Sequence, residues 1–413
     1  MTEVPTTSAT RPTDRRRGRR RVIAAACIAL LAAGAAIAWI VDRHSTHTAP
    51  QPSTLPRLPA YEIAPGAHGD CVYLPCGSLQ TAIARVALDQ ADGATVRIAA
   101  GQYGAQKMQH TVGTDAFKHN VVFEPAAGAQ VTFDSISVNT AHVTLKGLVV
   151  TGGFKILTAA VYSGFEQLTT QHGSAMLAAS HSFLRNSTIV PPVDADGIQI
   201  KAYSGHDPEG ITIENNVVGP THRGPKRAHV DCLQILGGSD ITVRYNRLFH
   251  CADQGIIVGS GATGTVGGKL DIERNEVQLC PQRTDDCDGF NAISIHAPSV
   301  VFVHNTVIDG GTVFDVTDLT IAGNYIESLK TCTGRIEANV ITSTRCTLAA
   351  GNRIGPQDFV NRQASPPNLT PVAAAVLPGA AQWVSPPFSV VDINGVAVKT
   401  SSPTPGAVQV PSP

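Results

Sequence analysis

The chain has 413 residues, of which 43% are hydrophobic and 15% charged, enough for a large buried core and too apolar for a chain disordered throughout. Its 31 basic and 32 acidic residues nearly cancel, so no overall electrostatic field favours nucleic acid as a partner. The 38 glycines and the low aromatic content of 5% suit short strands and tight turns better than a helical bundle.

The N-terminus carries a basic run followed by an apolar segment. Residues 1–21 end in RRRGRRR, and residues 22–41 are uncharged over about the 20 residues that cross a bilayer. The positive-inside rule then predicts a cytoplasmic tail and an extracytoplasmic main domain. A cleaved signal peptide is the alternative, although its apolar region usually has only about 7 to 15 residues. We therefore expect a single-pass cell-membrane protein, or a secreted one if the segment is cleaved.

A linker and a helix are predicted next. Residues 42–68 are rich in Pro, Ser and Thr and predict a linker, after which a folded domain is expected over residues 69–355. Near its start Ser78 can cap a helix. Apolar residues then recur at helical spacing, at Leu79, Ile83 and Val86. This pattern predicts a short amphipathic helix.

From there the sequence repeats an aliphatic strand that ends in an asparagine. The recurring asparagines are Asn186, Asn216, Asn246, Asn275, Asn305, Asn324, Asn339 and Asn352. Stacked coils of two or three short strands explain this period, because each coil buries its aliphatic side chains against its neighbours. The asparagines would tolerate left-handed dihedrals at the turn and bond to one another in a ladder. The predicted helix would cap the first coil and cover its edge.

Eight cysteines beyond the apolar segment occur as near neighbours in the sequence. They are Cys71 and Cys76, Cys232 and Cys251, Cys280 and Cys287, and Cys332 and Cys346. An even count after an export signal indicates disulfides. A metal site is the alternative, but no pair has CxxC spacing and no histidine cluster accompanies them. We expect bridges between sequential partners, although sequence alone leaves the connectivity open.

The repeats resemble the right-handed parallel β-helix proteins of the pectate-lyase-like superfamily. The resemblance covers about residues 70–355, and the entry SLQTAIARVALDQADGATVRIAAGQY is typical of it. It implies an all-β right-handed parallel β-helix solenoid with an N-terminal capping helix, preceded here by one transmembrane helix. Residues 356–413 fall outside the repeat, and for them we expect a C-terminal cover followed by a Pro-rich, disordered tail.

Four second strands of the coils place polar residues on one outer face. Their core residues should be Ile198, Ile200, Leu233, Ile235, Ile256, Val258, Ile293 and Ile295. Between these, Gln199, Gln234, Ile257 and Ser294 should face outward.

An acid or amide precedes each of the four strands, at Asp196, Asp231, Asp253 with Gln254, and Asn291. We place the acids in the turn before each strand, where they would stack into a column. At about 4.8 Å per strand, Asp231 would lie about 5 Å and Asp253 about 10 Å from Asp196. Stacked carboxylates raise a pKa or attract a cation. The alternative is that these are turn aspartates that cap backbone groups.

The order of motifs in this region also resembles the polygalacturonase family of glycoside hydrolases. The stretches are DADGIQI, VDCLQI, ITVRYN and CADQGIIVGSG, within residues 194–261. The resemblance implies that Asp196 and Asp231 are two of three catalytic aspartates that activate water, beside a Cys232–Cys251 disulfide. The sequence departs from the family at Val230, where the general-acid aspartate stands, and at Gln254, where the histidine stands; the Arg-x-Lys clamp is missing. HVDCLQ also resembles the His-x-Asp-x-x-Gln strand of secreted β-helix proteins.

Two loops beside this face carry charge. The loop THRGPKRAH before Asp231 is basic, and its residues are His222, Arg223, Lys226, Arg227 and His229; Lys201 ends the preceding strand. Arginine would pair with a uronate, and His229 or Lys201 could remove a proton, whereas the alternative is a solvated basic loop. The loop RTDDCDGFN adds Asp285, Asp286 and Asp288. It could bind Ca²⁺, the only cofactor that we consider, or simply be a disulfide-stapled acidic loop.

The leading hypothesis is an extracytoplasmic, membrane-anchored enzyme that hydrolyses an acidic or cell-envelope polysaccharide. The predicted catalytic residues are Asp196, Asp231, Asp253 and His229. The predicted substrate-binding residues are Gln199, Gln234, Gln254, Lys201, Arg223, Lys226 and Arg227. The alternatives are a lyase that cleaves a uronate polymer by β-elimination and a non-catalytic glycan-binding scaffold on the cell surface. The sequence indicates no oligomeric state.

Overall fold

The computed structural model describes residues 60–259, 266–349, 351–372, 391–398 and 404–409. The predicted cytoplasmic tail and membrane segment, residues 1–41, lie outside these ranges. Within the described part of the chain, no helix is both long enough and apolar enough to span a bilayer. The described residues all belong to one compact unit.

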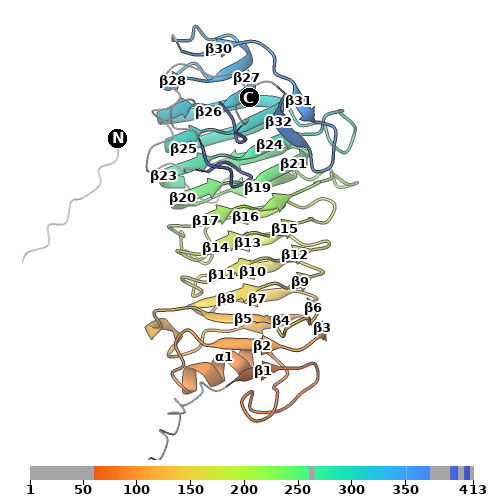
Figure 1. Cartoon of the computed structure of the whole chain (residues 1–413). Coiled ribbons are helices and arrows are strands. Elements are labelled where there is room, and N and C mark those ends of the chain that lie inside the picture. Colours follow the sequence, from red (N-terminus) through yellow and green to blue (C-terminus); the bar gives the residue numbers. More distant parts are fainter. Residues whose placement is uncertain (1–59, 260–265, 350, 373–390, 399–403, 410–413) are drawn as a thin grey trace, which may run out of the picture. The chain divides into compact units, whose positions relative to one another are not determined.

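Each coil of this unit consists of three short strands, and equivalent strands of successive coils pair in parallel (Figure 1). The coils therefore build three long parallel sheets, which together form the predicted right-handed parallel β-helix. We number the sheets in the order in which a coil passes through them. Sheet 1 matters most for function, because the predicted polar face lies on it.

The strands of sheet 1 are β4 (Gln106–Met108), β7 (Ile136–Val138), β10 (Phe154–Ile156), β13 (Ala175–Leu177), β16 (Ile198–Ile200), β19 (Asp231–Ile235), β22 (Gln254–Val258), and parts of β25 (Asn291–Val303) and β26 (Thr306–Ala322). Sheet 2 contains β1 (Tyr61–Ile63), β2 (Thr95–Ile98), β5 (Val121–Pro125), β8 (Val143–Lys146), β11 (Gly164–Glu166), β14 (Phe183–Arg185), β17 (Thr212–Glu214), β20 (Gly238–Arg244), β23 (Val266–Glu273), the ends of β25 and β26, and β28 (Arg335–Glu337). Sheet 3 contains β3 (Gly101–Tyr103), β6 (Val131–Phe133), β9 (Val149–Val150), β12 (Thr169–Thr170), β15 (Thr188–Ile189), β18 (Val217–Val218), β21 (Arg247–Cys251), β24 (Glu276–Leu279), the start of β26, β27 (Tyr325–Leu329), β29 (Val340–Thr344) and β30 (Arg353–Ile354).

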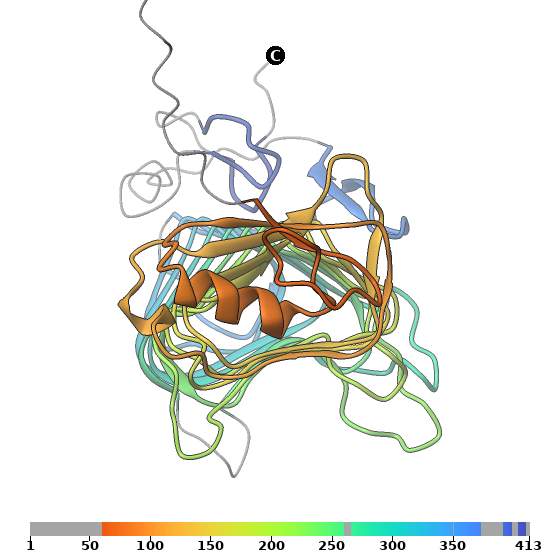
Figure 2. The same cartoon turned by 90° about the horizontal axis from the view of Figure 1, so that it is seen from below.

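The predicted capping helix is α1 (Leu79–Leu88), which covers the open end of the first coils when the molecule is viewed along its axis (Figure 2). The Ser78 hydroxyl caps it by accepting the N–H of Thr81 at 3.0 Å. Its apolar side is buried, at Leu79, Ala82, Ile83 and Val86. The linker prediction was wrong at its C-terminal end, because β1 already pairs with β2 within the range assigned to the linker.

The aliphatic residues predicted to face the core of sheet 1 are all buried. Successive coils keep one register there, with Gln199 paired to Gln234, Gln234 to Ile257, and Ile257 to Ser294. These four residues therefore form the predicted outward row. A strand period of two explains the result, since each aliphatic residue pointing inward sends its neighbour outward.

The asparagine ladder also forms, at the corner between sheets 2 and 3. The Asn216 side-chain N–H donates to Oδ1 of Asn246 at 3.0 Å, and the same bond recurs from coil to coil down to Asn352. Each accepting Oδ1 also receives the backbone N–H of the preceding ladder residue. The ladder thus satisfies buried polar groups that water cannot reach.

Two details of the ladder prediction were wrong. Asn186 lies outside the ladder, where its Oδ1 accepts the side-chain N–H of Asn215 at 2.6 Å. In its place, the backbone N–H of Ser187 donates to Oδ1 of Asn216, the first asparagine of the ladder. The left-handed residue is the one before each ladder asparagine, as at Asn215 (φ 52°) and Tyr245 (φ 57°). The chain therefore turns one residue earlier than predicted, and the ladder asparagine serves through its amide rather than through its backbone freedom.

The four disulfides join the sequential partners that the spacing predicted. The prediction for the C-terminal tail was partly wrong. Beyond the hairpin of β31 (Phe359–Asn361) and β32 (Asn368–Pro371), residues 404–409 pack against the β-helix instead of lying free. There the N–H of Ala407 donates to the Thr306 hydroxyl at 3.0 Å, and that of Gly406 to the carbonyl of Gly323 at 2.8 Å.

Candidate active site

The polar face of sheet 1 spans strands β16, β19 and β22. Asp231 pairs in register with Gln254, and the N–H of Asp231 donates to Oδ1 of Asp196 at 2.8 Å. The stacked column is therefore Asp196, Asp231 and Gln254. The geometric expectation that Asp253 continues it was wrong, because Asp253 precedes β22 by one residue and is out of phase. The prediction of a turn position was also wrong for Asp231, which is the first residue of β19.

Asp231 and His229 form the centre of this face. The side chain of Asp231 is fully buried, and its Oδ2 lies 3.0 Å from Nδ1 of His229, whose side chain is 49% exposed. Burial raises the pKa of Asp231 to about 6, against the opposing effect of the His229 hydrogen bond. In return, the hydrogen bond and the charge of Asp231 raise the pKa of His229 above its usual value. The buried carboxyl group of Asp231 thus orients the imidazole of His229, which solvent can reach, and favours its protonated form.

Asp196 supplies a second carboxyl group, two residues before the neighbouring strand β16. Burial raises its pKa, although it is less enclosed than Asp231. Its Oδ1 accepts the N–H of Asp231, and its Oδ2 accepts the amide of Gln199 at 2.7 Å. These bonds fix the orientation of the carboxyl group toward the outer face.

The outward glutamines connect the two acids. Gln199 donates to Oε1 of Gln234 at 2.8 Å, and Gln234 donates to Oδ2 of Asp231 at 3.3 Å. Lys201 donates to Oε1 of Gln199 at 3.1 Å. Together with Gln254 these groups form what we call the acid–histidine network, defined as Asp196, Gln199, Lys201, His229, Asp231, Gln234 and Gln254. All of its members were predicted as site residues.

Gln254 touches the exposed side of the imidazole. Its Nε2 lies 3.4 Å from Nε2 of His229, a contact that suits a neutral imidazole accepting from the amide. Its Oε1 is buried without a hydrogen-bond partner among the described residues. Turning the amide by half a rotation would let Oε1 accept a proton from a charged imidazole, so Gln254 can serve both states of His229.

Asp253 and Arg223 hold the loop that carries His229. Arg223 contacts both oxygens of the nearly buried Asp253, with Nε donating at 2.8 Å, and the N–H of Val230 donates to the same carboxylate at 2.7 Å. Arg223 also pairs with Asp288. Asp253 and Arg223 therefore lie outside the acid–histidine network, with their charges used in structural contacts. Lys226 and Arg227, by contrast, lie exposed on this loop.

Replacing Arg223 by methionine is expected to cost about 3 to 5 kcal/mol of unfolding free energy, because the buried Asp253 carboxylate would lose its cation. Urea unfolding measures the cost, with Arg227→Met as a control on the same loop that should change stability by at most about 0.5 kcal/mol. Adding Asp253→Asn to Arg223→Met should restore much of the loss. If Arg223→Met and Arg227→Met were equally stable, this would contradict a structural role for the ion pair of Arg223 with Asp253.

The acidic loop near Cys287 is also occupied by contacts. Asp286 accepts the Thr284 hydroxyl at 2.5 Å and lies 3.4 Å from Nδ1 of His222, while Asp288 pairs with Arg223. In the described ranges, no group of three or more His, Cys, Asp or Glu side chains is placed to hold a metal ion. Calcium binding at this loop stays a prediction.

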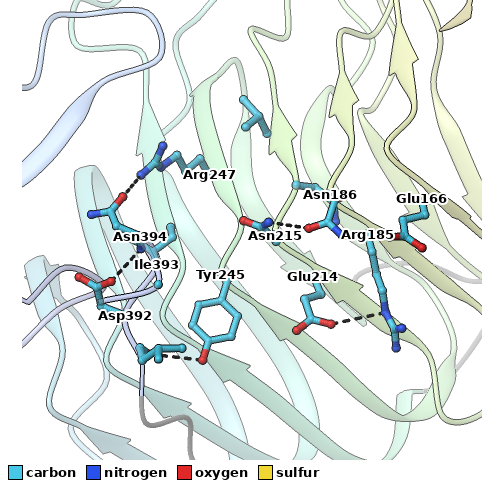
Figure 3. Close-up of a pocket in the computed structure, with 14 residues that line it drawn as sticks. Glu166, Arg185, Asn186, Glu214, Asn215, Tyr245, Arg247, Asp392, Ile393 and Asn394 are labelled. Carbon is cyan, nitrogen blue, oxygen red and sulfur yellow. Dashed lines mark hydrogen bonds and ion pairs between the residues drawn. The ribbon is translucent and has the colours of Figure 1, made fainter. Parts of the chain in front are cut away.

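A cavity of about 650 Å³ lies elsewhere, at the corner of sheets 2 and 3 beneath residues 391–395 (Figure 3). Arg185 and Glu214 in its wall are 3.4 Å apart, and Arg247 bonds Asn394 and pairs with Glu276 at 2.9 Å. Charges of opposite sign alternate up this edge of sheet 2, at Lys146, Glu166, Arg185, Glu214, Arg244 and Glu273. Neighbouring charges on this edge can therefore compensate one another.

Comparison with known proteins gives no family model and no curated protein that matches the chain. Solved structures do match. A pectate lyase is 14% identical over 85% of this chain and 96% of its own, with a TM-score of 0.44. A rhamnogalacturonan lyase is 15% identical over 72% and 87%, with a TM-score of 0.49, and a Dettilon tailspike protein is 13% identical over 67% and 65%, with a TM-score of 0.35. At such identities the likeness concerns the fold alone.

Proposed function

We propose that this chain is an enzyme that cleaves a polysaccharide by acid–base catalysis at the acid–histidine network. The observation that carries the proposal is the pairing of a fully buried carboxyl group, Asp231, with a half-exposed imidazole, His229. The motifs that resemble polygalacturonases support a polysaccharide as substrate. Two residues of these motifs lie side by side here, because Asp231 begins β19 and Asp196 precedes the paired strand β16 by two residues. A polymer also suits a face whose amides repeat from coil to coil.

In the proposed hydrolysis, His229 is the general acid. Asp231 bonds Nδ1 and so leaves Nε2 to meet the substrate, and by raising the pKa of His229 it favours the protonated imidazole. The proton passes from Nε2 to the glycosidic oxygen as the bond between that oxygen and the anomeric carbon breaks. His229 thereby supplies the proton donor that is missing at Val230.

Asp196 is the proposed general base. Its carboxyl group is held by Gln199 and by the backbone of Asp231, and it is the less buried of the two acids. It takes a proton from a water molecule as the water oxygen bonds to the anomeric carbon. The proton gained by Asp196 and the proton lost by His229 balance over the reaction, and solvent restores both groups.

A β-elimination is the second candidate, and the contact between Gln254 and His229 favours it. An amide donating to Nε2 suits a neutral imidazole, which could remove the proton next to the carboxylate of a uronate. Lys201 would balance the carboxylate charge. The electron pair of the broken C–H bond would form the double bond of an unsaturated sugar as the bond to the leaving oxygen breaks, and that oxygen would take a proton from solvent. Ultraviolet absorbance that grows during the reaction would contradict hydrolysis, because only elimination forms the double bond; its loss with a chelator would show that a metal ion takes part in the elimination.

The pH dependence of kcat/KM separates the two reactions further. Hydrolysis predicts a bell-shaped profile: activity falls below about pH 6, where Asp231 becomes protonated and no longer holds a charged His229. It also falls at alkaline pH as His229, with its raised pKa, loses the proton to be donated. Elimination predicts a rate that rises as His229 loses its proton and shows no later decline from that group. A plateau through the alkaline limb would therefore exclude His229 as the acid.

We also propose that the reaction takes place outside the membrane, on a cell-envelope glycan. Four disulfides support an oxidising compartment. The uncharged residues 22–41 after a basic run support a membrane anchor or an export signal.

A further inference from the structure

A second cavity, of about 440 Å³, lies on the coils that follow the acid–histidine network. Asn291 in β25 has the same strand phase as Gln254 in β22, since each stands two residues before the paired isoleucines. Asn291 pairs with Gly311, and Gly311 pairs with Ser328. Because Gly311 and Ser328 line this cavity, the column of residues that begins at Asp196 leads directly into it.

The two acids that line the cavity share one cation. Arg362 forms ion pairs with both, contacting Asp309 closely and Glu327 at 3.4 Å. Asp309 also accepts the amide of Gln278 at 2.8 Å. Both carboxylates are therefore held by Arg362, and the three groups together leave one negative charge.

Two cations in the lining remain without a carboxylate partner among the described residues. The guanidinium carbon of Arg283 lies 4.3 Å from the centre of the Phe290 ring, and Nζ of Lys330 donates to the neutral amide oxygen of Asn291 at 2.7 Å. Three cations, Arg283, Lys330 and Arg362, thus face the two carboxylates Asp309 and Glu327, and the cavity keeps a net positive charge. A carboxylate, sulfate or phosphate group would complete their bonding.

The shape of the cavity suits a ring. Phe290 is 67% exposed, and so presents a flat apolar surface to solvent. At Gly311 the side chains of Lys330 and Asn291 lie directly against the backbone, since a Cβ there would be 2.6 Å from Nζ of Lys330 and 2.8 Å from Oδ1 of Asn291. Only glycine leaves Lys330 in its present position. The cavity thus combines an exposed aromatic ring with two cations, one of which is seated on a glycine.

We propose that this anion subsite, defined by Arg283, Phe290, Gly311 and Lys330, binds a sugar residue that carries an anionic group. The group is a carboxylate or an ester of sulfate or phosphate, and the sugar ring lies against Phe290. At about 4.8 Å per strand, three strand steps put Ser328 about 14 Å from Gln254, within reach of an extended glycan held at His229. The position within a glycan rests on the proposed function, whereas the anionic chemistry rests on the cavity itself.

Calorimetric titration of the purified full-length chain tests this subsite. His229→Gln is present throughout, so that turnover does not interfere. Three probes are compared: an oligogalacturonate, a sulfated dextran oligosaccharide and an unsubstituted dextran oligosaccharide. We expect an anionic probe to bind more tightly than dextran, and both Lys330→Gln and Arg283→Gln to weaken that binding about 10-fold, the loss of one charge-assisted contact. Lys118→Gln, an exposed lysine near the N-terminal end, should leave it unchanged.

Two results would overturn the subsite: anionic probes that bind no better than dextran, or equal affinities for Lys330→Gln and Lys118→Gln. Which anionic probe responds tells a uronate from an ester. The outcome is separable from that of the proposed function. If the chain cleaves no glycan but binds the anionic probe in a Lys330-dependent way, the subsite is supported and the proposed enzymatic function is contradicted. If it cleaves a glycan without Lys330-dependent binding, the function is supported and the subsite is contradicted.

Discussion

Replacing Asp231 by asparagine is expected to lower kcat about 10²- to 10⁴-fold, because an oriented acid–base group contributes on that scale. An amide at this position carries no negative charge to stabilise a protonated imidazole, and because it can donate to Nδ1 as well as accept, it no longer fixes the tautomer of His229 that presents an Nε2–H to the substrate. Initial rates on a cleaved glycan measure the effect. Asp315→Asn, at an acid whose side chain is 83% exposed and which also contacts a histidine, is the matched control and should keep full activity.

The stability of the Asp231→Asn variant distinguishes a lost catalytic group from a lost fold. Since burial raises the pKa of Asp231 from 3.8 to about 6, the folded state holds this proton more tightly than the unfolded chain does. That stabilisation is complete below pH 3.8 and is lost as the pH rises through about 6. At pH 8 the wild type therefore carries the cost of a buried carboxylate, only partly offset by His229, and the variant does not. Urea unfolding at pH 8 should show the variant to be at least as stable; marked destabilisation there would contradict this.

The second large effect is expected for stability, at the asparagine ladder. Asn275→Ala should cost about 3 to 5 kcal/mol, because several buried groups would lose their partners at about 1 to 3 kcal/mol each. Oδ1 of Asn275 accepts the backbone and side-chain N–H groups of Asn246, both at 2.9 Å. Its own amide donates to the carbonyl of Val243 at 2.9 Å and to Asn305 at 3.0 Å.

Urea unfolding of Asn275→Ala is best compared with Asn186→Gly. Asn186 occupies the analogous corner but lies outside the ladder, and glycine keeps its left-handed backbone (φ 52°) without strain. We expect this control to cost less than about 1 kcal/mol. If the two variants unfold at the same denaturant concentration, the ladder does not carry the stability that we assign to it.

The fold was predictable because it is periodic. Aliphatic residues with a period of two, recurring asparagines and an early helix cap each describe a local event that the coils repeat, so one coil predicts the next. The cysteines were predictable for a related reason, since partners close in sequence meet at the corners of neighbouring or identical coils. The turn geometry was less predictable, because the sequence does not reveal which of two adjacent corner residues, such as Asn215 and Asn216, points inward.

The site was predictable except in its register. Asp196 and Asp231 each stand two residues before the first core residue of the strand, and the same count before Ile256 leads to Gln254, not to Asp253. Counting from the core residue rather than from the acid would have found the column. The ion pair of Arg223 with Asp253 and the anion subsite were beyond prediction, since both depend on irregular loops whose paths no repeat determines.

The most direct test of the account is the release of new reducing ends from a panel of acidic and neutral glycans by the full-length chain. We expect the wild type to release reducing ends from at least one glycan. The His229→Gln variant should do so about 10²- to 10⁴-fold more slowly, although its unfolding curve should match that of the wild type. Glycan binding without any release, unaltered by Asp231→Asn, would contradict it and would leave a scaffold in place of an enzyme.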